Sequence, residues 1–173
     1  FSDRYFIINY MDQEAVGEYS LLAQFSGFVL VLGSIHTIFV NPILYKTFAM
    51  NRSNGEFFLK KSLLILLLFL LFSYLIYLTI SDQIIGIFIT GELLEKESMK
   101  LVLNTLVASA MFTVLITAVT LRFTLSKQLG LLSIAWFLGA VVNLIGNFFI
   151  AEYGLVAAAF STLISNIIVL VTL

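Results

Sequence analysis

The sequence predicts an all-α integral membrane protein, a bundle of about five transmembrane helices plus the end of a sixth. Five long stretches without a charged side chain carry this prediction: Tyr19–Tyr45, Ser62–Ser81, Leu101–Leu121, Gln128–Ala151 and Tyr153–Leu173. A helix needs about 20 mostly apolar residues to cross the hydrocarbon core of a bilayer. Composition agrees, because 61% of the residues are hydrophobic and 11% are charged, whereas soluble domains carry about 25% charged residues.

Helices fit these stretches better than the strands of a membrane barrel do. Barrel strands alternate apolar and polar residues over about ten positions, but Leu63–Phe72 is apolar at every position. An unbroken apolar segment in lipid must satisfy its backbone hydrogen bonds internally, which a helix does. We therefore expect membrane helices at residues 18–45, 61–80, 99–121, 131–151 and 154–173.

Charged residues beside the apolar runs set the limits of each predicted helix. In chain order these are Glu18 and Lys46, Lys61 and Asp82, Lys100 and Arg122, and Lys127 and Glu152. Residues 1–11 have the character of the end of a preceding helix. The apolar piece at residues 84–90 is too short to cross a bilayer, so we expect it at the membrane interface.

Basic residues concentrate in two of the predicted loops: Lys46, Arg52, Lys60, Lys61, Arg122 and Lys127. The loop between the second and third helices mixes both signs, and the turn between the last two helices holds no basic residue. The positive-inside rule places basic loops in the cytoplasm, which also predicts a cytoplasmic C-terminus. The competing explanation is that so few charges alternate by chance.

Small and polar residues share one face on four of the five helices. The faces are Ser26, Gly27, Gly33, Ser34, Thr37 and Asn41; Thr105, Ser109, Thr113 and Thr117; Gly139, Asn143, Gly146 and Asn147; and Gly154, Ala158, Ser161, Thr162 and Ser165. Such faces serve close helix packing or line a hydrated cavity. Both readings stay open, and Asn41, Thr113, Asn143 and Asn147 are the candidates for a substrate pathway. The helix at 61–80 has no such face and is predicted to be peripheral.

Two residues of the first helix are further candidates. His36 is an ionisable residue inside a membrane helix, which marks it as a functional candidate; a neutral histidine bonded to a neighbouring helix is the simpler explanation. Pro42 removes one backbone hydrogen bond of the helix, so this position is either a hinge or a simple kink.

Asp3 and Arg4 form an adjacent pair of opposite charges in an apolar setting. One interpretation is an interfacial pair whose side chains extend to water. The other is functional: Arg4 faces an anionic substrate, or Asp3 binds a coupling ion, either H⁺ or Na⁺. The residues alone do not separate these interpretations.

Several classes of function are excluded by what the sequence lacks. There is no cysteine and a single histidine, so we expect no metal site built from these residues and no cofactor. The net charge of −1 predicts no nucleic-acid partner. Neither a GxxxxGK[ST] phosphate loop nor a GxSxG elbow occurs, and no catalytic residue is predicted, so the chain is not expected to be an enzyme.

Several motifs, in order, resemble the bacterial polysaccharide-biosynthesis or O-antigen flippase family. DRYFIINYMDQEAVGEYSL at Asp3–Leu21 is similar to a family segment with an Asp-Arg pair and a following Val-Gly-x-Tyr-Ser. FVNPILYKTF resembles the family's proline-containing helix end, and IIGIFITGELLEKESMKLVLNTL its short interfacial piece. VVNLIGNFFIAEYGLVAAAFSTLIS resembles a late signature with two asparagines four apart and a Tyr-Gly turn. Ala151 and Ala157 depart from it, since proline and glycine are common there.

The resemblance implies a fold of two six-helix bundles around a central cavity, in the multidrug/oligosaccharidyl-lipid/polysaccharide exporter superfamily. Residues 1–173 would be the C-terminal transmembrane bundle, and an N-terminal bundle of the same full-length protein would precede it. The implied location is the bacterial inner (plasma) membrane, as a multi-pass protein. The family's topology also predicts a cytoplasmic C-terminus.

The function that the resemblance implies is a flippase for a lipid-linked oligosaccharide. It would translocate an undecaprenyl-pyrophosphate-linked sugar for O-antigen, capsule or exopolysaccharide synthesis by alternating access. The alternatives are a cation-coupled multidrug exporter of the same superfamily and a membrane-embedded polysaccharide polymerase or ligase. The first would need carboxylates inside the membrane, and the second a large outer loop with basic and acidic residues. A purely structural subunit is a further possibility.

Overall fold

The computed structural model describes residues 2–88 and 97–173, with side chains described for residues 2–83 and 98–173. Seven helices make up this part of the chain. They are α1 (Ser2–Tyr10), α2 (Gln13–Ser26), α3 (Phe28–Met50), α4 (Arg52–Phe88), α5 (Glu97–Leu125), α6 (Leu129–Asn147) and α7 (Ile150–Thr172). No strand occurs among these residues.

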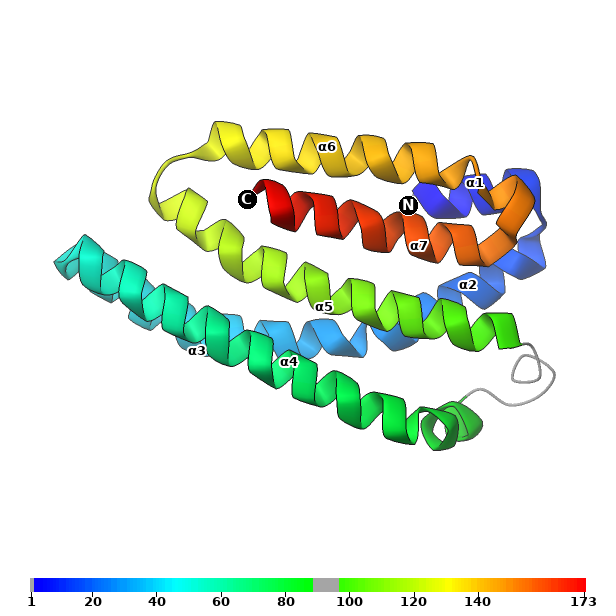
Figure 1. Ribbon diagram of the computed structural model, residues 1–173, viewed down its shortest axis with the longest axis horizontal. Coiled ribbons are helices and arrows are strands. Elements are labelled where there is room, and N and C mark those ends of the chain that lie inside the picture. The colour runs from blue at the N-terminus through cyan, green and yellow to red at the C-terminus, as the bar shows by residue number, and fades with distance from the viewer. Residues whose placement is uncertain (1, 89–96) are drawn as a thin grey trace.

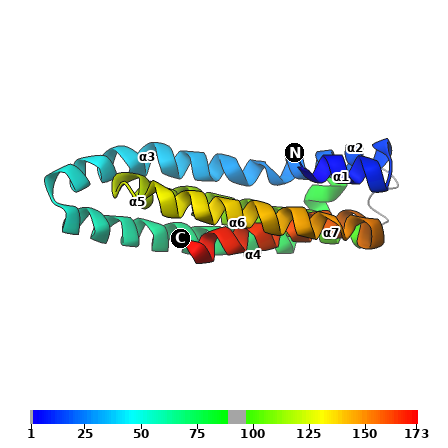
Figure 2. The same ribbon diagram turned by 90° about the horizontal axis from the view of Figure 1, so that it is seen from above.

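The long helices lie side by side in an elongated bundle (Figures 1 and 2). Helix α7 packs between α5 and α6, and α3 packs against both α4 and α5. The short helix α1 contacts α2, α6 and α7 at one end of the bundle. Helices from both ends of the sequence therefore meet there.

Five segments are long and apolar enough to cross a membrane, which fits the predicted multi-pass class. They are Gln13–Met50, Arg52–Gln83, Ser98–Leu125, Leu129–Asn147 and Ile150–Thr172. The first contains both α2 and α3, which are interrupted by a turn at Gly27. The all-helical fold and the number of spanning segments agree with the sequence prediction.

Helix limits differ from the predicted ones, most clearly in three places. The segment predicted at 18–45 is divided at Gly27 and extends from Gln13 to Met50. The segment predicted at 131–151 ends at Asn147, and residues 150–151 belong to α7. Helix α4 continues through residue 88, so most of the predicted interfacial piece 84–90 prolongs α4. Hydropathy marks the apolar part of a helix. It does not show how far the helix extends into charged residues, and it does not show a turn between apolar residues.

Exposed and buried residues are distributed as a lipid environment requires. Large apolar side chains face outward on every span, for example Phe72 on α4 and Phe137 on α6. Ser109, Asn147 and Ser161 are instead buried between helices. Because lipid tails solvate leucine and phenylalanine as well as a protein interior does, small and polar contacts are expected to add to the apolar packing between helices, such as that of Leu22, Val102 and Leu103.

Glycines place the backbones close together at three helix crossings. A Cβ atom at Gly33 would lie 2.6 Å from Val114 Cγ2, between α3 and α5. Gly139 packs directly on Val169, and Gly146 packs on Ser161, both between α6 and α7. These three glycines of the predicted small-residue faces therefore serve helix packing.

The two loops with the most basic residues lie at the same end of the bundle. The α3–α4 and α5–α6 turns and the C-terminus of α7 point to that end, whereas the α1–α2 and α6–α7 turns lie at the other (Figure 1). This arrangement agrees with the predicted alternation of the loops. Which end faces the cytoplasm stays a prediction.

Candidate functional site

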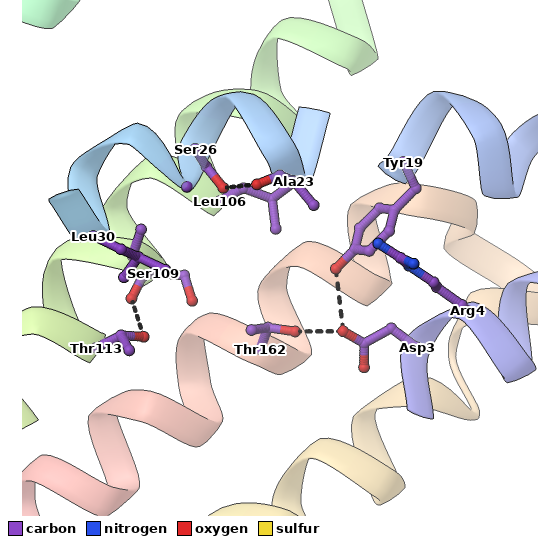
Figure 3. A pocket seen from close by; sticks show the side chains of 12 residues that line it. Asp3, Arg4, Tyr19, Ala23, Ser26, Leu30, Leu106, Ser109, Thr113 and Thr162 are labelled. Carbon is purple, nitrogen blue, oxygen red and sulfur yellow. Dashed lines mark hydrogen bonds between the residues drawn. The ribbon is translucent and has the colours of Figure 1, made fainter. Parts of the chain in front are cut away.

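A pocket of about 300 Å³ lies between α1, α2, the start of α3, α5 and α7 (Figure 3). Three of its lining residues were singled out from the sequence as pathway candidates: Asp3, Arg4 and Thr113. Hydroxyl groups from Tyr19, Ser26, Ser109 and Thr162 complete its polar wall. The pocket thus joins one carboxylate, one guanidinium and several hydroxyls between helices of the bundle.

Local structure explains how α1 is brought to this pocket. Asp12 caps the start of α2, where its Oδ1 accepts a hydrogen bond of 2.7 Å from the Ala15 amide. The chain reverses at this cap, so α1 and the first turns of α2 lie against each other. Ile7 and Tyr19 are buried in their contact with α5 and α7. Apolar packing on one face of α1 therefore leaves Asp3 and Arg4 at the pocket.

The carboxylate of Asp3 accepts hydrogen bonds from three other helices. Tyr19 Oη of α2 donates at 3.2 Å, Asn147 Nδ2 of α6 at 2.9 Å and Thr162 Oγ1 of α7 at 3.0 Å. All three donors are neutral. Burying a charge is costly unless it is hydrogen-bonded or paired, and these donors supply that compensation. The position of Asp3 thus depends on the relative positions of α2, α6 and α7.

A second layer of polar residues holds the donors of Asp3 in place. Asn147 Nδ2 lies 3.2 Å from Asn143 Oδ1, and its Oδ1 accepts a 2.8 Å bond from Ser161 Oγ. Asn143 Oδ1 also accepts from Ser2 Oγ at 2.8 Å. Asn147 is fully buried. Asn143 and Asn147, four residues apart on α6, are thus hydrogen-bonded to both α1 and α7.

Arg4 plays a different part from Asp3, although the two are adjacent in sequence. Its side chain is exposed and extends toward Tyr19 at the pocket (Figure 3). Among the described residues no ion pair is formed by Arg4, and the bonds to Asp3 come from neutral groups. The exposure of Arg4 fits both interpretations drawn from the sequence, an interfacial pair extending to water and a cation facing a substrate, whereas Asp3 is bonded to other helices. The guanidinium keeps its hydrogen-bonding capacity for another acceptor.

Thr113 belongs to a second polar contact, between α5 and α7. Asn166 Nδ2 lies 3.0 Å from Thr113 Oγ1, 2.9 Å from Ser109 Oγ and 3.1 Å from the Ser109 carbonyl oxygen. Sequence reasoning missed Asn166. An asparagine within an apolar run was the available signal, since such residues bond across helices.

His36, Asn41 and Pro42 do not reach this pocket. His36 is half-buried on α3 and approaches the Ser62 backbone of α4, while its Nε2 has no hydrogen-bond partner in the described part of the chain. Asn41 is half-buried further along α3. Helix α3 continues through Pro42 without interruption, so a hinge at Pro42 stays a prediction, and the turn in this span lies at Gly27.

Among the described residues, no group of three or more histidine, cysteine, aspartate or glutamate side chains could hold a metal ion. Part of the loop considered for a polymerase, residues 89–96, lies outside the described residues. Comparison with protein-family models, with curated proteins and with solved structures finds no match to this chain.

Proposed function

We propose that this chain forms the C-terminal bundle of a bacterial inner-membrane flippase for a lipid-linked oligosaccharide. The observation that carries the proposal is the pocket inside the bundle, where a carboxylate bonded to three helices lies beside an exposed arginine. The resemblance of the Asp3–Leu21 segment to the polysaccharide flippase family supports it. An N-terminal bundle of the same protein would complete the transport pathway.

Arg4 is the residue that we assign to the anionic part of the substrate. A pyrophosphate cannot pass through a low-dielectric region without cationic or hydrogen-bonding partners. A guanidinium binds phosphate oxygens in a bidentate manner, and hydroxyl oxygens at the pocket wall can accept hydrogen bonds from sugar hydroxyls. A pocket of about 300 Å³ is at the lower end of ligand sites, so it fits a headgroup and not a whole oligosaccharide.

Asp3 is the residue that we assign to coupling with an ion, H⁺ or Na⁺. An ionised carboxylate only accepts hydrogen bonds, but a protonated one also donates. Its three donors come from α2, α6 and α7, so protonation would reverse or break one of these contacts. Binding of a cation would likewise compete with them. Either event would change the balance between helix arrangements, as alternating access requires.

The experiment is complementation of a strain that lacks the gene, with surface polysaccharide measured at matched protein level. We expect Arg4→Ala to lower surface polysaccharide, because the cation at the pocket is lost. Lys100→Ala is the control: Lys100 is an exposed cation that pairs with Asp82 and lies outside the pocket. Unchanged polysaccharide with Arg4→Ala would remove Arg4 from the mechanism.

A cation-coupled multidrug exporter is the second candidate, and one observation favours it. Asp3 is a carboxylate held among membrane helices by neutral donors, as an ion-coupling site requires. The two functions differ in their phenotypes. If the knockout keeps its polysaccharide, and expression of the gene gives drug resistance that Asp3→Asn removes, the exporter replaces the flippase as the conclusion.

A further inference from the structure

The charges of this protein are segregated between the two ends of its bundle. Six exposed cations lie around the α3–α4 and α5–α6 turns and are called here the basic end: Lys46, Arg52, Lys60, Lys61, Arg122 and Lys127. Glu56 is the one carboxylate in these stretches of sequence, and it pairs with Arg52 at 3.3 Å. The other five cations form no ion pair within the described residues. The basic end therefore carries an uncompensated positive charge.

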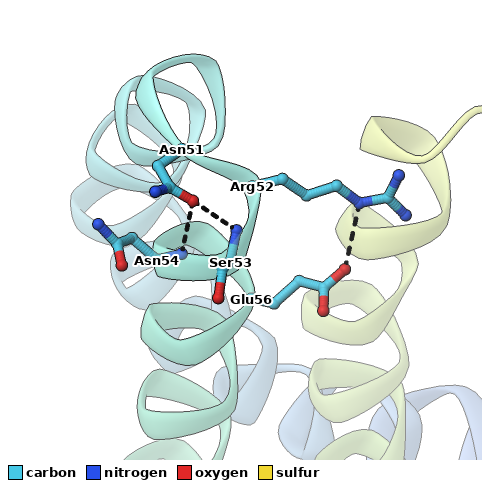
Figure 4. A network of polar contacts seen from close by, with 5 residues as sticks. All are labelled: Asn51, Arg52, Ser53, Asn54 and Glu56. Atoms are coloured by element: carbon cyan, nitrogen blue, oxygen red, sulfur yellow. Dashed lines mark hydrogen bonds and ion pairs between the residues drawn. The ribbon is translucent and has the colours of Figure 1, made fainter.

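A second pocket, of about 380 Å³, lies within the basic end where three helix ends meet. Its apolar wall comes from Tyr45, Phe48 and Ala49 of α3 and from Leu125 of α5, and its polar groups are Arg52 and Ser126. Glu56 binds Nε of Arg52, and the two terminal nitrogens of the guanidinium point away from that carboxylate (Figure 4). Those nitrogens are free to bind an anion at the pocket.

The helix ends around this pocket are already capped, so recognition falls to the side chains. Asn51 Oδ1 accepts hydrogen bonds from the amides of Ser53 at 2.9 Å and Asn54 at 3.4 Å, which satisfies the start of α4 (Figure 4). At the end of α5 the Gln128 amide donates to the Phe123 carbonyl at 2.9 Å. Backbone groups at these turns thus offer little to a ligand.

Lys127 occupies the position in the α5–α6 turn where glycine is favoured. Its φ of 58° lies in the left-handed region, which costs a residue with a side chain about 1 kcal/mol. Glycine is the common residue at this position after a helix. The sequence instead keeps a cation there, which adds to the charge of the basic end.

We propose that the pocket at Arg52 binds the phosphate headgroup of an anionic phospholipid from the surrounding bilayer. The ligand must combine an anion with an apolar chain, because the pocket combines a guanidinium with apolar walls. Tyr45 of the pocket wall and Ile38, two helical turns earlier on the same face of α3, are exposed, so a chain would continue along α3 into the lipid. Basic pockets between membrane helices on the cytoplasmic side bind such headgroups. This proposal does not depend on the transported substrate.

The test compares phosphatidylglycerol with phosphatidylcholine, each added to the full chain purified in a neutral detergent. Bound lipid is measured by native mass spectrometry and the thermal midpoint by circular dichroism. We expect preferential binding of phosphatidylglycerol, with an affinity about fivefold weaker in Arg52→Gln. Lys100→Gln removes the same charge at the opposite end and should leave this affinity unchanged.

A second variant separates lipid binding from folding. Lys127→Gly removes a cation and also relieves the left-handed backbone, so it should raise the thermal midpoint in neutral detergent. The same variant should reduce the additional stabilisation by phosphatidylglycerol. Equal binding of the two lipids, or an equal loss in Lys100→Gln, would overturn the proposal. It would also be overturned if inorganic phosphate at the same concentration stabilised the protein as well as the lipid does, because the site would then bind any anion.

Discussion

The contact of Gly139 with Val169 leads to a prediction about how α6 and α7 are held together. A Cβ atom at Gly139 would collide with Cγ2 of Val169 and lie 3.2 Å from Ser165 Oγ. Val169 is buried, and a valine in a helix has one strongly preferred rotamer, so it cannot turn away easily. Ser165 Oγ also donates to the Gly139 carbonyl at 2.8 Å, which fixes the spacing of the two backbones.

The expected effect of Gly139→Ala follows from two opposing contributions. Alanine stabilises a helix by about 0.5–1 kcal/mol relative to glycine. Overpacking a closely packed contact costs about 1–3 kcal/mol. We therefore expect the free energy of unfolding to fall by about 1–2 kcal/mol. Gly17→Ala is the matched control, because a Cβ atom there would meet no atom within 4 Å, and it should be stabilising by about 0.5–1 kcal/mol.

A double-mutant cycle ties the effect to the named contact. Val169→Ala removes the methyl groups that the new Cβ would meet, so the double variant should be more stable than the sum of the single effects by about 1–2 kcal/mol. The assay is reversible unfolding in mixed micelles, followed by far-ultraviolet circular dichroism. If Gly139→Ala is as stabilising as Gly17→Ala, or if the two effects are additive, the close packing of α6 on α7 is refuted.

Two further predictions concern single polar groups. Asn166→Ala should lower the free energy of unfolding by about 1–2 kcal/mol in the same assay, since interhelical hydrogen bonds in membranes contribute up to about 1.7 kcal/mol. The Asn166 amide lies within 3.1 Å of acceptors on Ser109 and Thr113. An unchanged free energy of unfolding would mean that α5 and α7 associate without this amide. Asp12→Ala should cost about 1 kcal/mol because it removes the cap that accepts from Ala15, and Asp12→Asn, which keeps the acceptor, should restore most of that stability.

The candidate site was predicted only in part from the sequence, for an identifiable reason. Asp3 and Arg4 were found because adjacent charges in an apolar setting are conspicuous, and Asn143 and Asn147 because they share a face of α6. Thr162 was noted only as a member of a small-residue face and Tyr19 only as part of a motif, and neither was a pathway candidate. Tyr19 and Thr162 lie 16 and 159 positions from Asp3 in the sequence. No local sequence pattern relates residues at these separations.

The sequence by itself determined the class of this protein. Long uncharged runs require a lipid environment and a helical backbone, because the bilayer leaves no other partner for the amide and carbonyl groups. Small-residue faces also predicted the close helix crossings at Gly33, Gly139 and Gly146, although α4, which has no such face, packs against α3 as well. These properties are local, so composition and periodicity were sufficient to predict them.

The tertiary structure alone decided which polar residues act together. It brought α1 against α6 and α7, so that Asp3 is bonded by neutral groups while Arg4 remains exposed at a pocket. It placed the interruption of the first span at Gly27 and left α3 continuous through Pro42. The physical reason is that a hydrogen bond between helices depends on the rotation and spacing of both partners, and helix packing sets these for all helices together.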